Sequence, residues 1–157
     1  MYGVDTDMIN IITVGKIKEK YIIDGINEYL KRLAKYAKVN LIELSDDSFD
    51  KVKTLKSESE RILSKLDLKS FIVTLEIDGK ELNSMEFSEL IDKTLTNYSD
   101  ITFIIGGSNG IHDSIKNIVN YKLSFSKMTF PHQLIRVFLL EQIFRAFKIS
   151  NGETYHR

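Results

Sequence analysis

The chain has 157 residues, of which 43% are hydrophobic, so its length and composition are typical of one globular domain with a single core. It contains no cysteine, which excludes disulfide bonds and cysteine-ligated zinc sites. No apolar run reaches the roughly 18 residues of a membrane-spanning helix. Together these features predict a cytoplasmic protein without a membrane partner.

The net charge is zero, but the charges are distributed unevenly along the chain. Residues 111–157 carry seven Lys and Arg against three Asp and Glu, whereas residues 1–110 carry fifteen against nineteen. The three histidines, His112, His132 and His156, also lie in the basic part. A phosphate-rich partner such as nucleic acid prefers a basic surface. Chance variation over so short a segment is the simpler explanation when the charges are considered alone.

Strand patterns and helix patterns alternate along the chain from residue 8 onward. In chain order, the first half predicts a strand at 8–14, a helix at 21–38, a strand at 39–44 and, after a turn at 46–48, a charged helix at 49–66. The second half predicts a strand at 70–77 closed by Asp78-Gly79, a helix at 85–95 capped by Asn83 or Ser84, a strand at 101–105, a short helix at 111–119, a strand at 122–125 and a long helix at 132–149. This alternation is typical of an α/β domain with a largely parallel sheet. Residues 1–7 precede the pattern, so we interpret them as an upstream or non-native extension and residues 8–157 as a single domain.

Two loops in the C-terminal third are the strongest functional signal. Residues 106–110 (GGSNG) follow one predicted strand, and residues 124–132 (SFSKMTFPH) follow the end of the next. Glycine allows a backbone to approach a ligand closely, and α/β sheets bind ligands at the carboxyl ends of their strands. We therefore predict a cofactor site between these loops. The first loop lacks the glycine and lysine patterns of dinucleotide and triphosphate sites, and each loop considered alone is also explained as an ordinary turn.

The predicted helix at 132–149 is apolar around nearly its whole circumference. Such a helix must be covered on more than one side, so we predict that it packs on the core and also forms a homodimer with a second copy of the chain. Arg136 falls among the apolar positions and therefore needs a partner or a ligand. Glu141 and Arg145 are four residues apart and can pair with each other.

The C-terminal residues Tyr155, His156 and Arg157 combine an aromatic ring, an imidazole and a guanidinium. These groups suit stacking on RNA bases and pairing with phosphates. A disordered chain end is the simpler explanation of their composition alone.

Six segments of the sequence together point to a known family. They are Ile12–Tyr21, Thr74–Lys80, Ile105–Gly110, Leu123–His132, Arg136–Arg145 and Tyr155–Arg157. In their order and spacing they closely resemble the RlmH family, the bacterial large-subunit ribosomal RNA pseudouridine N3-methyltransferases of the SPOUT superfamily. The resemblance covers residues 8–157.

This resemblance implies an α/β fold with a C-terminal trefoil knot, a homodimer formed through the knot region, and S-adenosylmethionine bound in the knot without a metal. The cofactor contacts of the family map onto Leu75, Gly106, Phe125, Ser126, Lys127, Met128, Thr129 and Phe130. A positive side chain beside a sulfonium is electrostatically unfavourable. We therefore expect Lys127 to turn its ammonium away from the cofactor and to face it with its backbone.

The resemblance also implies methyl transfer to N3 of a pseudouridine in the large (23S) ribosomal RNA on the assembled ribosome. The candidate catalytic residues are His132, Arg136 and His156, because N3 must lose its proton. Tyr155, His156 and Arg157 are the candidates for binding the target. Two alternatives remain open, namely a methyltransferase that acts on another RNA and a ribosome-binding knot protein without catalytic activity.

Overall fold

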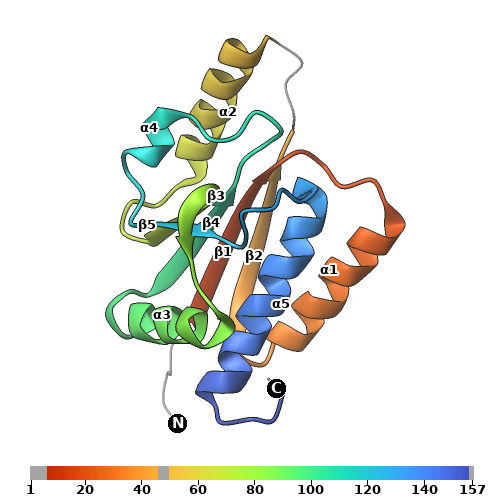
Figure 1. Cartoon of the computed structure of the whole chain (residues 1–157), viewed down its shortest axis with the longest axis vertical. Helices are drawn as coiled ribbons and strands as arrows, with labels where there is room; N and C mark the ends of the chain where they lie inside the picture. Colours follow the sequence, from red (N-terminus) through yellow and green to blue (C-terminus); the bar gives the residue numbers. More distant parts are fainter. Residues whose placement is uncertain (1–6, 46–49, 156–157) are drawn as a thin grey trace.

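The fold is a five-stranded parallel sheet with helices on both faces (Figure 1). The computed structural model describes residues 7–45 and 50–155. The strand order is β2-β1-β4-β3-β5, and each neighbouring pair is parallel. The α/β class and the largely parallel sheet predicted from the sequence are therefore confirmed.

Strands and helices alternate along the chain in the predicted order. The elements are β1 (Asp7–Val14), α1 (Lys20–Leu33), β2 (Ala37–Leu44), α2 (Lys51–Lys65), β3 (Phe71–Glu81), α3 (Ser84–Asn97), β4 (Asp100–Ile105), α4 (Asp113–Lys116), β5 (Tyr121–Ser124) and α5 (His132–Ser150). Asn83 caps α3 as expected, since its side chain accepts a hydrogen bond from Glu86 N while the Glu86 carboxylate accepts one from Asn83 N.

The central strands are buried on both faces, which explains why they read as continuous apolar runs. In β1, Ile9 and Ile11 pack with α1, α3 and α5, whereas Ile12 and Val14 pack with α2 and α4. Two hydrophobic clusters, one on each face, therefore hold the helices on the sheet.

Two boundaries near the N-terminus differ from the sequence prediction. β1 begins at Asp7, within the segment interpreted as an extension, because Asp7 pairs with Ala37 of β2. α1 ends at Leu33 rather than at residue 38. A turn follows, in which Tyr36 N donates to Leu33 O at 2.8 Å. Tyr36 then stacks on Phe147 of α5. Strand pairing and aromatic packing therefore override the helical periodicity of the last predicted turn.

The buried side of α2 carries polar as well as apolar side chains. The helix begins at Lys51 with Asp50 as its cap, whereas the predicted turn at 46–48 lies outside the described residues. Its buried side chains are Thr54, Glu58, Ser59 and Ile62. Two apolar residues of the helix are exposed instead, Val52 over 75% and Leu63 over 37% of their surfaces. Polar residues are buried here because α2 packs beside the glycine loop, where Glu58 lies against Gly107.

The Asp78-Gly79 pair does not end β3, which continues to Glu81 through a bulge. Leu75 and Lys80 both pair with Leu123, so the residues between them leave the ladder. A Cβ on Gly79 would lie 2.8 Å from the backbone of Lys122 and Leu123, so the bulge needs glycine for close approach rather than for a turn.

α4 is also shorter than the predicted helix at 111–119. His112 caps it, with Nδ1 accepting from Ser114 N at 3.1 Å. After the helix, Asn120 Oδ1 accepts a hydrogen bond from Ile72 N at 2.8 Å. This contact with β3 draws the chain out of the helix and into β5.

Candidate functional site

A cavity of about 470 Å³ lies where β3, β4 and β5 end. Its walls come from the bulge of β3, the loop after β4, the loop after β5 and the first turn of α5. The lining residues used below are Leu75, Glu76, Asp78, Gly106, Ile111, Lys116, Phe125, Ser126, Met128, Thr129, Phe130, His132 and Ile135. The volume is within the range of roughly 300–1,000 Å³ that is common for small-molecule sites.

The first loop, 106–110, is closed by its own backbone. Gly107 and Gly110 form an isolated bridge, and Gly110 N donates to Gly107 O at 3.0 Å. Gly110 has a φ of 85°, which favours glycine. A Cβ on Gly106 would lie 2.5 Å from Gly110 O, so only glycine permits this closure. The loop is a tight turn, as one interpretation of the sequence held, and it also lines the cavity.

The second loop, 125–130, is ordered by hydroxyl groups. Ser124 Oγ donates to Ile77 O and to Ser126 O, both at 3.0 Å, and thus joins the loop to the bulge of β3. Ser126 Oγ accepts from Met128 N at 3.0 Å. The predicted cofactor residues at 125, 126 and 128–130 all line the cavity, whereas Lys127 is exposed and is not part of the lining.

The chemistry of the lining fits a nucleoside cofactor. Met128, Phe130 and Ile111 supply apolar surface for a planar base, and Ser126 and Thr129 supply hydroxyl groups. Within residues 7–45 and 50–155, no group of three or more His, Asp and Glu side chains is placed to hold a metal ion. None of the described helices is both long and apolar enough to cross a membrane.

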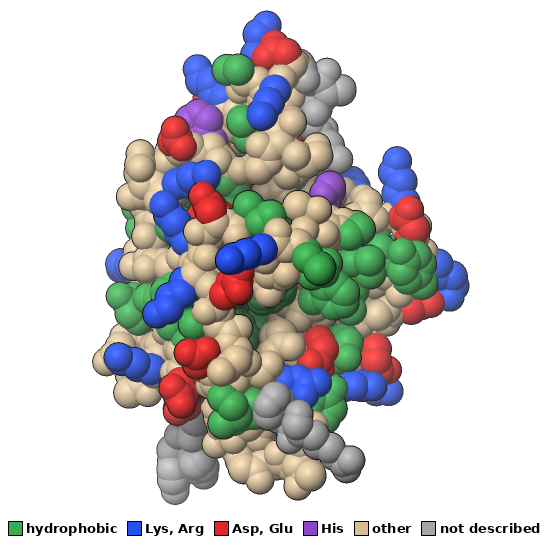
Figure 2. Space-filling model, viewed as in Figure 1, with side chains coloured by type: hydrophobic (Ala, Val, Ile, Leu, Met, Phe, Trp, Pro, Cys, Tyr) green, Lys and Arg blue, Asp and Glu red, His purple; other side chains and the backbone are tan. Residues whose placement is uncertain are grey.

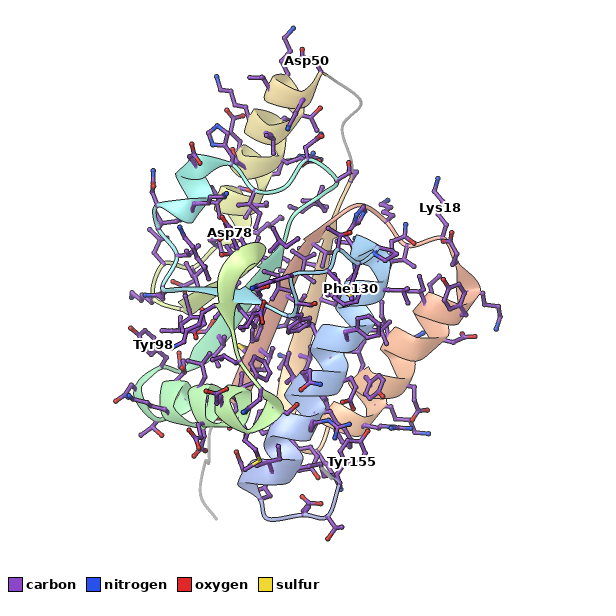
Figure 3. All side chains as sticks on the ribbon, in the orientation of Figure 1. Lys18, Asp50, Asp78, Tyr98, Phe130 and Tyr155 are labelled. Atoms are coloured by element: carbon purple, nitrogen blue, oxygen red, sulfur yellow. The ribbon has the colours of Figure 1, made fainter. Side chains whose placement is uncertain are left out.

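The sequence analysis did not identify the charged residues that line the cavity from the bulge and from α4. The Glu76 carboxylate accepts from Thr74 Oγ1 at 2.6 Å and lies 3.3 Å from Lys116 Nζ. The side chain of Glu76 is only 6% exposed. Asp78 follows on the same bulge and is exposed (Figure 3). The sequence signals at Glu76 and Asp78 were the Thr74–Lys80 segment shared with the family and the predicted strand end at Asp78-Gly79, which suggested a turn rather than a wall of the site.

The predicted catalytic residues occupy different environments. His132 begins α5 and lines the cavity. Arg136, one turn later, is 1% exposed and is not part of the lining. One of its terminal nitrogens donates to Val14 O at 2.9 Å and to Gly15 O at 2.7 Å. The other lies 3.6 Å from Glu43, so the guanidinium joins α5 to the ends of β1 and β2.

The last described residue, Tyr155, is docked on α5 (Figure 3). Its hydroxyl donates to Glu141 at 2.8 Å, and Arg145 donates to the same carboxylate group at 2.7 Å. The guanidinium of Arg145 lies 4.7 Å from the centre of the Tyr155 ring. Burial, together with the hydrogen bond to Glu141, raises the pKa of Tyr155 to about 12. The expected Glu141–Arg145 pair is confirmed, whereas His156 and Arg157 lie outside the described residues.

α5 packs on the core, and its opposite face is only partly covered in the single chain. Leu139, Leu140 and Ile143 are fully buried in the core. Phe138 on the other side is 39% exposed and packs edge-on against Phe130 of the second loop. Figure 2 shows hydrophobic side chains gathered on this face, near α5 and α1. An apolar surface beside the cavity is thus open to a partner.

Comparison with known proteins shows similarity over the full length. Residues 8–156 match the family model described as predicted SPOUT methyltransferase. The ribosomal RNA large subunit methyltransferase H of Clostridium acetobutylicum is 51% identical in an alignment of 157 positions. The alignment covers 95% of this chain and 99% of that protein. The protein of the same name from Carboxydothermus hydrogenoformans is 48% identical with the same coverage.

Two solved structures share the fold at low sequence identity. The "probable methylase family protein" from Haemophilus influenzae Rd KW20 has a TM-score of 0.57 and 10% identity, over 95% of this chain and 70% of that chain. AviRb from Streptomyces viridochromogenes, a SpoU methyltransferase in complex with AdoMet, has a TM-score of 0.50 and 11% identity, over 96% of this chain and 63% of that chain. The matched family model and the full-length relatives show that the chain belongs to the SPOUT methyltransferase family.

Proposed function

We propose that this protein transfers a methyl group from S-adenosylmethionine to N3 of a pseudouridine in large-subunit ribosomal RNA on the assembled ribosome. Family membership and the names of the full-length relatives support methylation of large-subunit ribosomal RNA. The observation that carries the proposal is the cavity itself, because both glycine- and hydroxyl-rich loops expected to hold the cofactor line it. A ribosomal target also agrees with action in the cytoplasm.

The residues assigned to the cofactor are Leu75, Gly106, Phe125, Ser126, Lys127, Met128, Thr129 and Phe130. When bound, S-adenosylmethionine supplies an activated methyl group. The apolar side chains of the second loop would enclose the adenine ring, and the backbone of both loops would bind its polar edges. Lys127 contributes its backbone, in agreement with its exposed side chain outside the lining. We infer that the C-terminal knot of the family builds this arrangement.

Methyl transfer requires orientation and the loss of the N3 proton. Orientation of two reactants is worth roughly 7–11 kcal/mol in favourable cases. His132 lines the cavity, which supports it as the group that accepts the proton. Arg136 is directed to the ends of β1 and β2, so we propose that it acts by holding α5 rather than by touching the base. His156 remains a second candidate for proton transfer.

The RNA-binding surface is proposed to form in a homodimer. The exposed Phe130–Phe138 face lies beside the cavity, so a second copy that packs on it also borders the reaction site. Tyr155 is anchored by Glu141, and we propose that His156 and Arg157, which follow it in the sequence, bind the target RNA. The basic balance of residues 111–157 supports this assignment.

The test is methyl transfer from labelled S-adenosylmethionine to intact ribosomes that carry or lack the large-subunit pseudouridines. We expect labelling only of ribosomes that carry them. Equal labelling of both would contradict the pseudouridine target, and labelling of transfer RNA alone would favour the alternative substrate. No labelling of any RNA, despite calorimetric binding of the cofactor, would favour a non-catalytic ribosome-binding role.

A further inference from the structure

The cofactor cavity has a charged wall that lies outside the two loops assigned to the cofactor. Glu76 and Asp78 line it from the bulge of β3, and Lys116 lines it from α4. Apart from His132, these are the residues with ionisable side chains among the described lining residues. Two carboxylates against one ammonium leave this wall with a net negative charge.

The fold holds Glu76 in place at this wall. Its carboxylate accepts from the buried Thr74 hydroxyl at 2.6 Å, and Lys116 Nζ lies 3.3 Å from its other oxygen. With 6% of its side chain exposed, Glu76 is poorly screened by water. The bulge keeps Glu76 and Asp78 out of the hydrogen-bond ladder with β5. The Ser124 hydroxyl holds the bulge in position by donating to Ile77 O. The Glu76 carboxylate is therefore a fixed part of the cavity wall, and Asp78 adds an exposed charge beside it.

The proposed reaction changes the charge of the molecule in this cavity. S-adenosylmethionine carries a sulfonium, an ammonium and a carboxylate, and so has one net positive charge. S-adenosylhomocysteine, the product, has a neutral thioether in place of the sulfonium and no net charge. A fixed negative wall in a part-buried cavity attracts the cation more strongly than the neutral product.

We propose that Glu76, together with Asp78, is a specificity-determining residue that makes the cavity prefer the cationic methyl donor to its neutral product. The positive charge of Lys116, 3.3 Å from Glu76, offsets part of the negative charge and so reduces this preference. At a given concentration of each, the preference raises the share of sites that hold fresh donor rather than spent product. This inference rests on the proposed function, because it requires S-adenosylmethionine in this cavity.

Two substitutions in the same ion pair have opposite expected effects. A single charge at such a site is worth on the order of tenfold in affinity. Glu76→Gln should therefore weaken binding of S-adenosylmethionine about tenfold, and binding of S-adenosylhomocysteine by less than about threefold. Lys116→Gln should shift the same ratio in the opposite direction. A purely structural role for the pair predicts instead that both substitutions weaken both ligands alike.

The experiment is isothermal titration calorimetry of the full chain with S-adenosylmethionine, S-adenosylhomocysteine and sinefungin, a cationic analogue with an amine in place of the sulfonium. Sinefungin should follow S-adenosylmethionine in each variant. Glu89→Gln, an exposed carboxylate on α3, is the matched control and should leave all three affinities unchanged. Asp78→Asn removes an exposed charge from the same wall. It tests the same charge argument if Glu76→Gln does not fold.

An unchanged ratio of donor to product affinity in both Glu76→Gln and Asp78→Asn would overturn the inference. So would a shift of the ratio in the same direction for Glu76→Gln and Lys116→Gln. Failure of the unsubstituted protein to bind either ligand would contradict the proposed function itself, and is thereby distinguished from a failure of the charge argument.

Discussion

Replacement of the buried Arg136 should reveal how α5 is held on the sheet. The guanidinium is 1% exposed and donates to Val14 O at 2.9 Å and to Gly15 O at 2.7 Å. Arg136→Met keeps a long apolar stem but removes every donor. A buried acceptor left without its donor costs about 1–3 kcal/mol, and Glu43 loses its nearby cation as well. Part of this loss is offset because the guanidinium no longer has to be desolvated.

The net effect expected for Arg136→Met is a free energy of unfolding lowered by about 2–4 kcal/mol. For a chain of this size, that change corresponds to a melting temperature about 5–15 °C lower. Urea unfolding followed by circular dichroism measures the first quantity, and a thermal scan checks the second. Arg136→Lys should recover only part of the loss, because its single ammonium nitrogen cannot replace both terminal nitrogens of the guanidinium, one at the two carbonyl oxygens and the other beside Glu43.

Arg32→Met is the matched control for this experiment. Arg32 donates to Glu28 at 2.8 Å on the surface of α1, and 42% of its side chain is exposed. An exposed ion pair is screened by solvent, so its loss should change stability far less. If Arg136→Met unfolds at the same urea concentration as Arg32→Met and the unsubstituted protein, then the contacts with β1 do not hold α5 and the reasoning fails.

Three further predictions address the bulge, the chain end and pH. Gly79→Ala places a Cβ 2.8 Å from the backbone of β5 and should lower the free energy of unfolding in urea by about 1–3 kcal/mol. Gly25→Ala is the control and should be neutral or stabilising, because its Cβ would meet only Val137 at 3.6 Å or more. Equal stability of the two variants would show that the bulge relaxes freely. Deletion of 155–157 should abolish methylation of ribosomes while calorimetric binding of S-adenosylmethionine stays nearly intact, and retained activity would exclude the proposed role of the chain end. The raised pKa of Tyr155 means that the folded state keeps the phenol proton more tightly than the unfolded state, so its contribution to stability is complete below about pH 10 and is lost as the pH rises toward about 12. Tyr155→Phe should flatten this alkaline loss in urea midpoints, and an identical slope would refute the assignment.

Local sequence patterns were sufficient for the order of the elements and for the parallel sheet. Strands such as β4 are buried along their whole length, so they read as apolar runs without alternation. Capping chemistry is equally local, and Asn83 with Glu86 marks the start of α3 from four adjacent positions. Boundaries set by remote partners were not predictable in this way. α1 stops at Leu33 because Ala37 pairs with Asp7 of β1 and Tyr36 stacks on Phe147 of α5.

In the site as well, local patterns predict some features and contacts between remote segments decide the others. The sequence by itself determined that two loops of small and hydroxyl residues follow two successive strands of the chain, and parallel strands bring such loops to one edge of the sheet. Only the tertiary structure decided that Glu76 lines the cavity and that Arg136 reaches Val14, 122 residues away in the chain. Periodicity reports the neighbours of a residue within one helical turn or one strand. The partner of a buried charge is selected by how remote segments pack. For Glu76, that packing includes a bulge whose geometry appears only when β3 and β5 are paired.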